Sequence, residues 1–474
     1  MSRTPVPQRT FADVEFLRQG VQLEPTLQRI ATFLDRHATL VDGVRRDLLR
    51  GLKRPTRGRR GLTPAQTLRS LILMRVKNWD YRELRERIAD GYTLRSFTQF
   101  ESQCVPKHDA FNRAFNRLTP ATLQAVNDAV VQAAVTLGVE DGTKLRVDTT
   151  VVETDIHHPT DSTLLWDTVR VVTRLVQQLD DLLPAGVGLF TVRTRAARRR
   201  MYEIQCMTAK ERHTQQVPTY RALIQITEQV VAEARAVVAR AQAPRGNVLT
   251  GATIAVLKQQ IGAYCDLGDR VLDHTRRRVL GGEQVPADEK VYSIFEPHTD
   301  LIKRGKERKP IEFGHKVFLA ESGHGLITQY RVLKGNPADQ DHVTPSLERH
   351  ADAFGQAPEL YSADRGFFSA ANLKACQTAG VTCACIPQAG GTRSAEREAT
   401  EKSRPFKQGQ RFRAGIEGRI SVLFRGRGMK RALVEGRERF ELLVGAAVLA
   451  NNLMVIAARL QPKRKPARRR RPAA

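Results

Sequence analysis

Along the first 140 residues, apolar side chains recur at the spacing of amphipathic helices, and polar residues mark where the helices begin. Thr63-Pro-Ala-Gln66 has the form of a capping box with proline at the first helical position. Further helix starts are predicted at Asp80 and at Thr119, each just before an apolar run. Residues 1–140 are therefore expected to form a helical N-terminal domain.

From residue 141 the pattern changes to that of strands. The predicted strands are 144–152, 312–320, 326–333, 360–364 and 381–386. Helical spacing returns at 163–183, 219–241, 252–280, 369–380 and 411–424. The close succession of strand, helix and strand after residue 360 predicts a parallel pair with a right-handed connection. This order of elements is that of a ribonuclease-H-like core, a mixed five-stranded sheet of the α+β or α/β class, with a large helical insertion after the first strand.

The predicted division of the chain has five parts. They are the helical N-terminal domain at 1–140, the ribonuclease-H-like core at 141–155 and 311–440, the helical insertion at 156–310, a C-terminal helix at 441–461 and a basic, disordered tail at 462–474. The short N-terminal helices fit either a helix-turn-helix that enters a DNA groove or a plain helical bundle.

Charge narrows the choice of partners. The 474 residues contain 77 Lys plus Arg against 50 Asp plus Glu, a net charge of +27, which favours a polyanion. The basic residues gather at 50–60, 193–200, 303–309 and 463–471. Nucleic acid is expected and a membrane is not, because the most apolar stretch, 442–457, contains two asparagines and fits a buried helix. The N-terminus lacks the apolar core of a signal peptide and the six cysteines form no regular framework, so a cytoplasmic location is expected.

Asp148 places a carboxylate inside the strand-forming run KLRVDTTVV. An ionised carboxylate that is removed from water needs a cation, and neighbouring Lys144 or Arg146 could supply it. The predicted sheet offers a second explanation. Asp364 ends the fourth strand, where ligand sites of open sheets gather, and Glu417 lies on the last core helix. Three such carboxylates suit two Mg²⁺ or Mn²⁺ ions about 3.5 to 4 Å apart, the arrangement that serves phosphoryl transfer.

Each of these acidic residues also has a simpler explanation when it is considered alone. Glu417 lies four residues after Arg413 and fits an ordinary ion pair within one helix. Asp339 and Asp341 follow the third strand and could replace Asp364, although a loop residue beside a proline more readily caps the next helix. Only the combination of the three carboxylates indicates a metal site.

The start of the predicted insertion contains further polar and aromatic candidates. His157 and His158, with Glu153 and Asp155, have the composition of a metal cluster. Adjacent side chains of a strand point to opposite faces, so DNA contact or a structural role is favoured over one ion bound by both histidines. Trp166 fits a core residue beside two leucines, or a platform on which an unpaired base stacks near a cut DNA end.

Four segments, in this order, resemble the Asp-Asp-Glu transposases of bacterial insertion sequences, most closely the ISNCY-type group. They are RVDTTVVETDIHHPTDSTLLWD, LKGNPADQDHVTPSLERH, YSADRGFFS and FRAGIEGRISVLFRGRGMKR. The segment LILMRVKNWDYRELRERIADGYTLRSFTQF is similar to the N-terminal domain of the same enzymes. The resemblance covers nearly the whole chain.

The resemblance implies a metal-dependent enzyme in which Asp148, Asp364 and Glu417 form the catalytic and metal-binding triad. Arg413 matches the basic residue of the related Tyr-Arg-Glu-Lys signature, where it would contact phosphate. The rest of that signature differs from this sequence, in which Gln410 takes the Tyr position and Phe424 the Lys position, with Arg425 and Lys430 as possible substitutes. The phosphate-positioning roles are therefore less well defined than the metal roles.

Together these features predict a transposase that cleaves DNA at the ends of an insertion sequence and joins the freed strand to target DNA. Double-stranded DNA, with terminal inverted repeats and a target, would be the partner, and a homodimer or higher oligomer would hold two ends in a bacterial cytoplasm at the nucleoid. The alternative is a catalytically inactive DNA-binding protein derived from a transposase. A recombinase would instead need a nucleophile such as Tyr361 and would form a covalent adduct with DNA.

Overall fold

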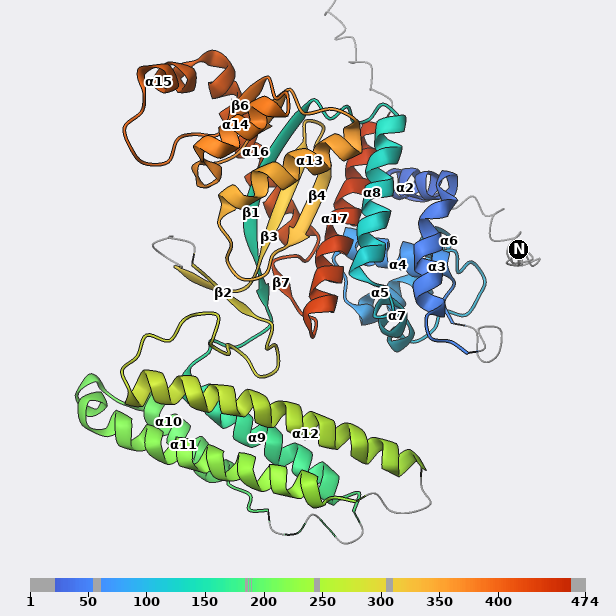
Figure 1. Cartoon of the computed structure of the whole chain (residues 1–474). Helices are drawn as coiled ribbons and strands as arrows, with labels where there is room; N and C mark the ends of the chain where they lie inside the picture. The colour runs from blue at the N-terminus through green and yellow to red at the C-terminus, as the bar shows by residue number, and fades with distance from the viewer. Residues whose placement is uncertain are drawn as a thin grey trace, which may run out of the picture. The chain divides into compact units, whose positions relative to one another are not determined.

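The structure is a computed structural model that describes residues 22–53, 61–183, 186, 188, 190–242, 248–303 and 310–461 (Figure 1). The chain divides into two compact units. The first unit contains the residues up to Val152, Lys316–Leu333 and the residues from Pro337 onward, and the second contains Glu153–His315 and Lys334–Asn336. The tail at 462–474 and most of the basic segments at 50–60 and 303–309 lie outside the described residues.

Helices form the N-terminal part of the first unit, as the sequence predicts. They are α2 (Pro25–Arg36), α3 (Val41–Leu49), α4 (Pro64–Lys77), α5 (Tyr81–Asp90), α6 (Tyr92–Thr98), α7 (His108–Phe115) and α8 (Pro120–Thr136). The capping box is present, because the Thr63 hydroxyl accepts from the Gln66 backbone N–H at 3.1 Å and the Gln66 side chain accepts from the Thr63 N–H at 3.0 Å. Asp80 and Thr119 cap α5 and α8 through their side chains, as expected.

A mixed sheet of seven strands follows these helices. Its strands are β1 (Lys144–Thr154), β2 (Asp300–Lys303), β3 (Ile311–Ser322), β4 (Ile327–Val332), β5 (Leu360–Ser362), β6 (Cys383–Cys385) and β7 (Arg431–Ala432). The order is β2-β3-β1-β5-β6, with β4 paired to β3 and β7 to β1. β5 is parallel to β1 and to β6, as the sequence predicts, whereas β3 is antiparallel to β2 and to β4. The expected five strands are present, and the short strands β2 and β7 are additional.

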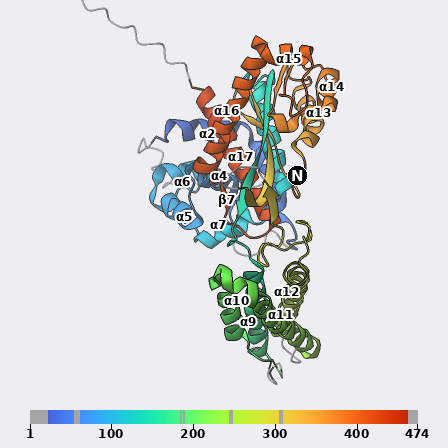
Figure 2. The ribbon, with the colours of Figure 1, turned by 90° about the vertical axis from the view of Figure 1, so that its left-hand side faces the viewer.

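Helices of the first unit cover both faces of its part of the sheet (Figure 2). On one face, β1 and β3 side chains pack with α13 (Val343–Phe354) and α14 (Ala370–Thr378). On the other face they pack with α16 (Arg404–Gly426) and α17 (Arg437–Arg459). Successive side chains of a strand point to opposite faces, so Val317 and Phe318 of β3 belong to different apolar clusters. Asp148 therefore lies on a strand that is buried from both sides.

The second unit consists largely of helices with one apolar core. They are α9 (Asp161–Asp180), α10 (Thr194–Cys206), α11 (Ala209–Arg240), α12 (Val248–Thr275) and the π-helical turn η2 (Arg276–Leu280). Leucine, isoleucine and valine side chains at helical spacing form its core, among them Leu175, Leu223 and Ile261. The three helices predicted from the sequence correspond to α9, α11 and α12, whereas α10 was not predicted.

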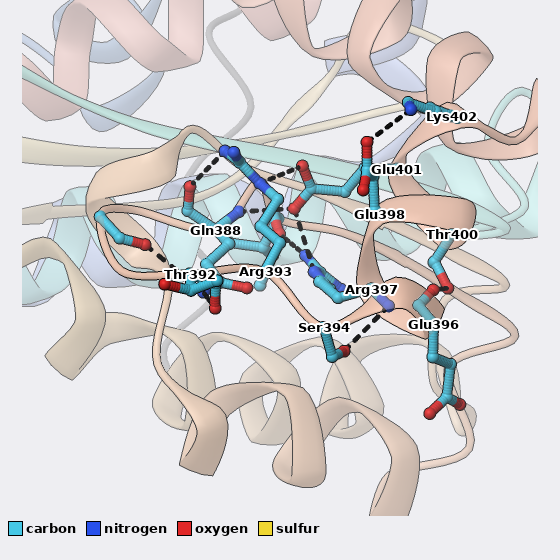
Figure 3. Close-up of polar contacts among 12 residues, drawn as sticks. Gln388, Thr392, Arg393, Ser394, Glu396, Arg397, Glu398, Thr400, Glu401 and Lys402 are labelled. Carbon is cyan, nitrogen blue, oxygen red and sulfur yellow. Dashed lines mark hydrogen bonds and ion pairs between the residues drawn. The ribbon is translucent and has the colours of Figure 1, made fainter.

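The segment between β6 and α16 is tied to the end of β6 by polar contacts around Glu401, on α15 (Ala395–Lys402) (Figure 3). The Glu401 carboxylate accepts from the Gln388 backbone N–H at 2.8 Å, from Arg397 at 3.0 Å and from Arg393 at 3.1 Å. Burial alone would raise the pKa of Glu401, but the Gln388 hydrogen bond and the two guanidinium groups outweigh it and lower that pKa. These contacts fix the start of α16, which follows directly.

α17 is long and apolar enough to cross a membrane by length and composition. Most of its apolar window, 83%, is buried within the protein, which is typical of a core helix. The two asparagines in its centre make hydrogen bonds within the protein, which is consistent with a buried helix. The Asn452 side chain exchanges hydrogen bonds of 2.9 Å with the backbone N–H and C=O of Ile327, and Asn451 accepts from Arg419 at 3.1 Å. The prediction that this stretch forms a buried helix is confirmed.

Candidate active site

The register of the sheet explains why Asp148 and Asp364 lie near one another. In the parallel pair of β1 and β5, Arg146 is the partner of Ser362. If the same register is continued by two residues beyond this pair, Asp148 lies opposite Asp364. Asp364 itself lies just beyond β5 and caps the turn η4 (Arg365–Phe367), at the carboxyl end of the strand where ligand sites of such sheets gather.

α16 brings Arg413 and Glu417 to these two aspartates, and two glycines allow its close approach. A Cβ atom at Gly409 would lie 2.2 Å from Cys385 Sγ, and one at Gly415 would lie 2.1 Å from Arg146 Nη1. No side chain larger than hydrogen therefore fits at either position without a shift of the neighbouring atoms.

Gln410 also holds α16 against the sheet. Its amide donates to the backbone oxygens of Cys385 at 2.6 Å and Ala363 at 3.2 Å, at the ends of β6 and β5. Gln410 occupies the position at which the sequence departs from the transposase signature, and its contacts place α16 beside the residue that precedes Asp364. No pattern in the sequence indicates this role, because both acceptors are backbone atoms distant along the chain.

One guanidinium group contacts all three of the carboxylates singled out by the sequence. Arg413 Nη2 lies 3.2 Å from Asp148 Oδ2 and 3.8 Å from Asp364 Oδ2, and Arg413 Nη1 lies 3.3 Å from Glu417 Oε1. The expected pairing of Glu417 with Arg413 within the helix is present. Arg413 thus pairs with Asp148, whereas Arg146, two residues before Asp148, pairs with Glu321.

Each aspartate uses one oxygen for the backbone and directs the other toward Arg413. Asp148 Oδ1 accepts from the Thr149 N–H at 2.7 Å, and Asp364 Oδ1 accepts from the Gly366 N–H at 2.8 Å. These bonds fix the orientation of both carboxylates. Arg413 Nε, by contrast, is buried and has no hydrogen-bond partner among the described residues. The guanidinium is therefore held by its outer nitrogens only.

Asp339 adds a fourth carboxylate beside this group. Its Oδ1 accepts from the Thr149 hydroxyl at 2.8 Å and pairs with Lys316 Nζ at 2.7 Å. A Cβ atom at Gly366 would lie 3.1 Å from both Asp339 Oδ2 and Asp364 Oδ1, so the two carboxylates flank that glycine. The sequence allows Asp339 as a rival of Asp364, and the structure places the two carboxylates close to one another. Lys316 was missed, because its strand shows no pattern that distinguishes it.

The donor chemistry of this group fits a divalent cation. Four carboxylates face one arginine and one lysine, which leaves a formal excess of two negative charges in the group. Carboxylate oxygens are the ligands that Mg²⁺ and Mn²⁺ prefer. Asp148, Asp364 and Glu417 surround the Arg413 guanidinium and do not form a compact ligand trio, so binding of an ion requires Arg413 to move.

Among the described residues, one trio of possible ligands has all its atoms within 4.8 Å, namely Glu140, Asp141 and His324. Its hydrogen bonds give it a structural explanation. Glu140 accepts from the backbone N–H groups of Asp141 and Gly142 and from the Ser322 hydroxyl. The buried Glu140 carboxylate thus joins the turn before β1 to the end of β3.

A buried ion-pair network anchors the strand and the helix that carry the site. Glu321 on β3 has a fully buried side chain and pairs with Arg146 at 2.8 Å and Arg419 at 2.9 Å. Arg146 also donates to the Phe412 backbone oxygen at 2.6 Å. β1, β3 and α16 are thereby connected through charged groups. The sequence did not reveal this network, because its members are far apart along the chain.

The remaining candidate residues lie on other segments of the chain. Arg425 and Lys430 are exposed at the end of α16 and just after it. His157 and His158 lie in a loop, since β1 ends at Thr154, so the expected strand geometry does not apply to them. His157 lies 3.4 Å from Asp167, and the His158 ring packs edge-on against Phe313.

Tyr361 is unsuited to act as a nucleophile. Its side chain is fully buried in β5, and burial raises the pKa of its hydroxyl. A covalent attack needs a hydroxyl that can reach DNA and lose its proton. The recombinase alternative is therefore not supported by this residue.

Comparison with known proteins gives one family. Residues 21–117 match the family model of a transposase domain (DUF772). This segment contains α2 to α7, including Thr63 and Asp80, whose side chains cap α4 and α5. No curated protein and no solved structure matches the chain.

Proposed function

We propose that this protein is an Asp-Asp-Glu transposase with a ribonuclease-H-like core, which cleaves DNA strands at insertion-sequence ends and joins them to target DNA. The observation that carries the proposal is the meeting of Asp148, Asp364 and Glu417 around Arg413. The transposase domain at residues 21–117 supports the same function independently. The order of the strands, with β1 central, β3 and β4 on one side and parallel β5 and β6 on the other, supports the core assignment.

In this proposal the chain's own residues have four tasks. Asp148, Asp364 and Glu417 hold Mg²⁺ or Mn²⁺, which would polarise the scissile phosphate and activate the attacking oxygen. Arg413 turns from the carboxylates to a phosphate oxygen, for which its planar donors are suited. Asp339 and Thr149 hold the turn η3 (Asp339–His342) against β1, beside the proposed metal ligands. Arg425 and Lys430 are proposed to contact the DNA backbone further along.

Asp148→Asn tests the proposal. The amide keeps the shape of the side chain but removes a charged ligand, so strand cleavage in Mg²⁺ is expected to fall by at least about 100-fold while DNA binding persists. The measurement is cleavage of a labelled duplex that carries the terminal repeats found beside the coding region. Asp352→Asn, an exposed change on α13, is the matched control and should cleave as the unmodified protein does. Undiminished cleavage by Asp148→Asn would exclude this mechanism.

The alternative is a catalytically inactive DNA-binding protein derived from a transposase. Under this alternative, the unmodified protein binds the repeats but does not cleave them in Mg²⁺ or Mn²⁺. All three carboxylates are present and gathered at one guanidinium, which favours the active enzyme.

A further inference from the structure

Glu140, Asp141 and His324 form a compact cluster in the first unit. Glu140 and Asp141 lie in the turn between α8 and β1, and His324 lies in the hairpin between β3 and β4. One possible ligand atom of each side chain lies within 4.8 Å of those of the other two. The hydrogen bonds of Glu140 explain where its carboxylate lies, but they supply it with no positive charge.

The Glu140 carboxylate is buried without a permanent cation beside it. Its side chain is 0% exposed, and the one basic side chain within 4.0 Å of it, among the described residues, is that of His324. An imidazole ring is charged only when it binds a second proton, unlike a lysine or an arginine. Because an ionised carboxylate that is removed from water is costly without a cation, the cluster has a place for a positive charge.

The spacing of the three side chains is close to that of ligands around a metal ion. His324 Nδ1 lies 3.3 Å from Glu140 Oε1 and 3.7 Å from Asp141 Oδ1. Both separations exceed those of charge-assisted hydrogen bonds, which are about 2.7 to 2.9 Å. Ligand atoms that bind a tetrahedral zinc ion at about 2.1 Å lie about 3.4 Å from one another. An ion therefore fits between these atoms after small shifts of the side chains.

Hydrogen bonds already orient both carboxylates, as they do in metal sites, where the ligating carboxylates are themselves hydrogen-bonded. Glu140 accepts from the N–H groups of Asp141 at 3.1 Å and Gly142 at 3.2 Å, and from the Ser322 hydroxyl. Asp141 Oδ1 accepts from the Thr143 N–H at 3.0 Å and from the Thr143 hydroxyl at 2.8 Å. These bonds hold the two side chains in place before an ion binds.

Backbone contacts also fix the hairpin that carries His324. The Gly323 N–H donates to the backbone oxygen of Lys144, at the start of β1, at 2.9 Å. The Arg459 side chain, at the end of α17, donates to the His324 backbone oxygen at 3.0 Å. Gly325 completes the turn with a φ of +93°, a conformation that favours glycine. An ion at the cluster would therefore join the turn after α8 to a hairpin that is already attached to β1 and α17.

We propose that Glu140, Asp141 and His324 bind one divalent transition-metal ion of the Zn²⁺ class, with water completing its coordination. One imidazole nitrogen with two carboxylate oxygens suits Zn²⁺ better than Mg²⁺, which is bound by oxygen ligands. The side chains of Asp141 and His324 are 53% and 32% exposed, so an ion reaches the cluster from solvent. The site uses none of the proposed catalytic carboxylates and does not depend on the proposed function.

Isothermal titration calorimetry with Zn²⁺ tests the proposal on the untagged full-length protein, freed of metal with EDTA and kept in excess Mg²⁺ at neutral pH. His324→Ala and Asp141→Asn should each lose one equivalent of bound Zn²⁺, or bind it at least about tenfold more weakly. Both changes affect partly exposed side chains, so both variants are expected to fold. His213→Ala, an exposed change on α11, is the matched control and should bind as many ions as the unmodified protein does.

Equal stoichiometry and affinity in His324→Ala and in the unmodified protein would overturn the proposal, since the zinc would then be bound elsewhere. A second result would also overturn it. If no Zn²⁺ binds, and the unmodified protein is more stable than His324→Ala by an amount that disappears as the pH rises, the cation beside Glu140 is the His324 imidazolium. Asp148→Asn should keep the zinc equivalent, so loss of the proposed catalytic function would leave this inference standing.

Discussion

At the scale of single residues, the central feature is that one arginine forms ion pairs with three carboxylates. Arg413 is mostly buried, and its two outer nitrogens contact Asp148, Asp364 and Glu417. Without it, these negative charges would face one another in a partly dry site, where repulsion is poorly screened. In the proposed mechanism, a divalent cation and the guanidinium would compete for the same oxygens.

Arg413→Gln tests this competition. The variant should be less stable by about 1 to 3 kcal/mol without divalent ions, because the carboxylates lose their cation. Mg²⁺ should then raise its melting temperature more than that of the unmodified protein. Thermal unfolding with and without MgCl₂ measures both effects, and Arg411→Gln, an exposed change on α16, is the control. An equal Mg²⁺ response in all three proteins would contradict the idea that Arg413 and the metal share ligands.

At the scale of elements, the position of α16 depends on the fully buried Glu321. Its pairs with Arg146 and Arg419 connect β1, β3 and the helix. Glu321→Gln would leave two guanidinium groups facing a neutral amide, and breaking a buried pair costs about 3 to 5 kcal/mol. Chemical denaturation should show that the free energy of unfolding falls by an amount near the lower end of this range.

Glu441→Gln provides the matched control for Glu321→Gln. Glu441 pairs with Arg437 within α17 at 2.9 Å, and both side chains are partly exposed. Such pairs contribute about 0.5 kcal/mol, so this variant should be nearly as stable as the parent. Similar losses in the two variants would show that the Glu321 network does not anchor α16.

The contact of α13 with the turn before β1 should be sensitive to acid. His350 on α13 is buried, its Nε2 lies 2.9 Å from the Gly142 oxygen, and its ring stacks on Phe354. Burial lowers the pKa of His350 to about 4, although the Gly142 contact opposes the shift.

The unfolded chain therefore binds a proton at His350 more readily than the folded protein does. The contribution of this residue to stability is complete above about pH 6.5 and declines, by up to about 3 kcal/mol, as the pH falls to 4. Urea denaturation of the parent and of His350→Gln across this range measures the effect. The variant should show a flatter dependence, and parallel curves would contradict the prediction.

At the scale of the whole molecule, the net charge of +27 should make the proposed binding to DNA depend on salt. The segment from Pro462 onward, which lies outside the described residues, contains seven basic side chains and no acidic one. Its deletion should weaken binding to any duplex by the same factor. The slope of log affinity against log salt should become shallower by at most about six.

Fluorescence anisotropy at several salt concentrations, with a terminal-repeat duplex and an unrelated one, measures this effect. If the deletion changes the ratio of the two affinities, the segment contributes to sequence recognition and does not act by charge alone.

Much of the local structure was determined by the sequence alone. Helix starts at Thr63, Asp80 and Thr119 follow from side chains that bond to backbone groups two or three residues away. The five main strands follow from apolar patterns that repeat within a few residues. The expectation of a polyanionic partner also follows from the sequence, because net charge does not depend on the fold.

Only the tertiary structure decided which side chains meet. The sequence predicts that a cation lies beside Asp148 but does not identify it. Arg413, which pairs with Asp148, follows 265 positions later, and no local pattern relates the two residues. The additional strands β2 and β7 are too short to produce a pattern, and Trp166 has the same leucine neighbours whether it faces a core or a cavity. The spacing of apolar residues shows which face of a helix or strand is buried, whereas contacts between distant residues depend on how the helices and strands pack.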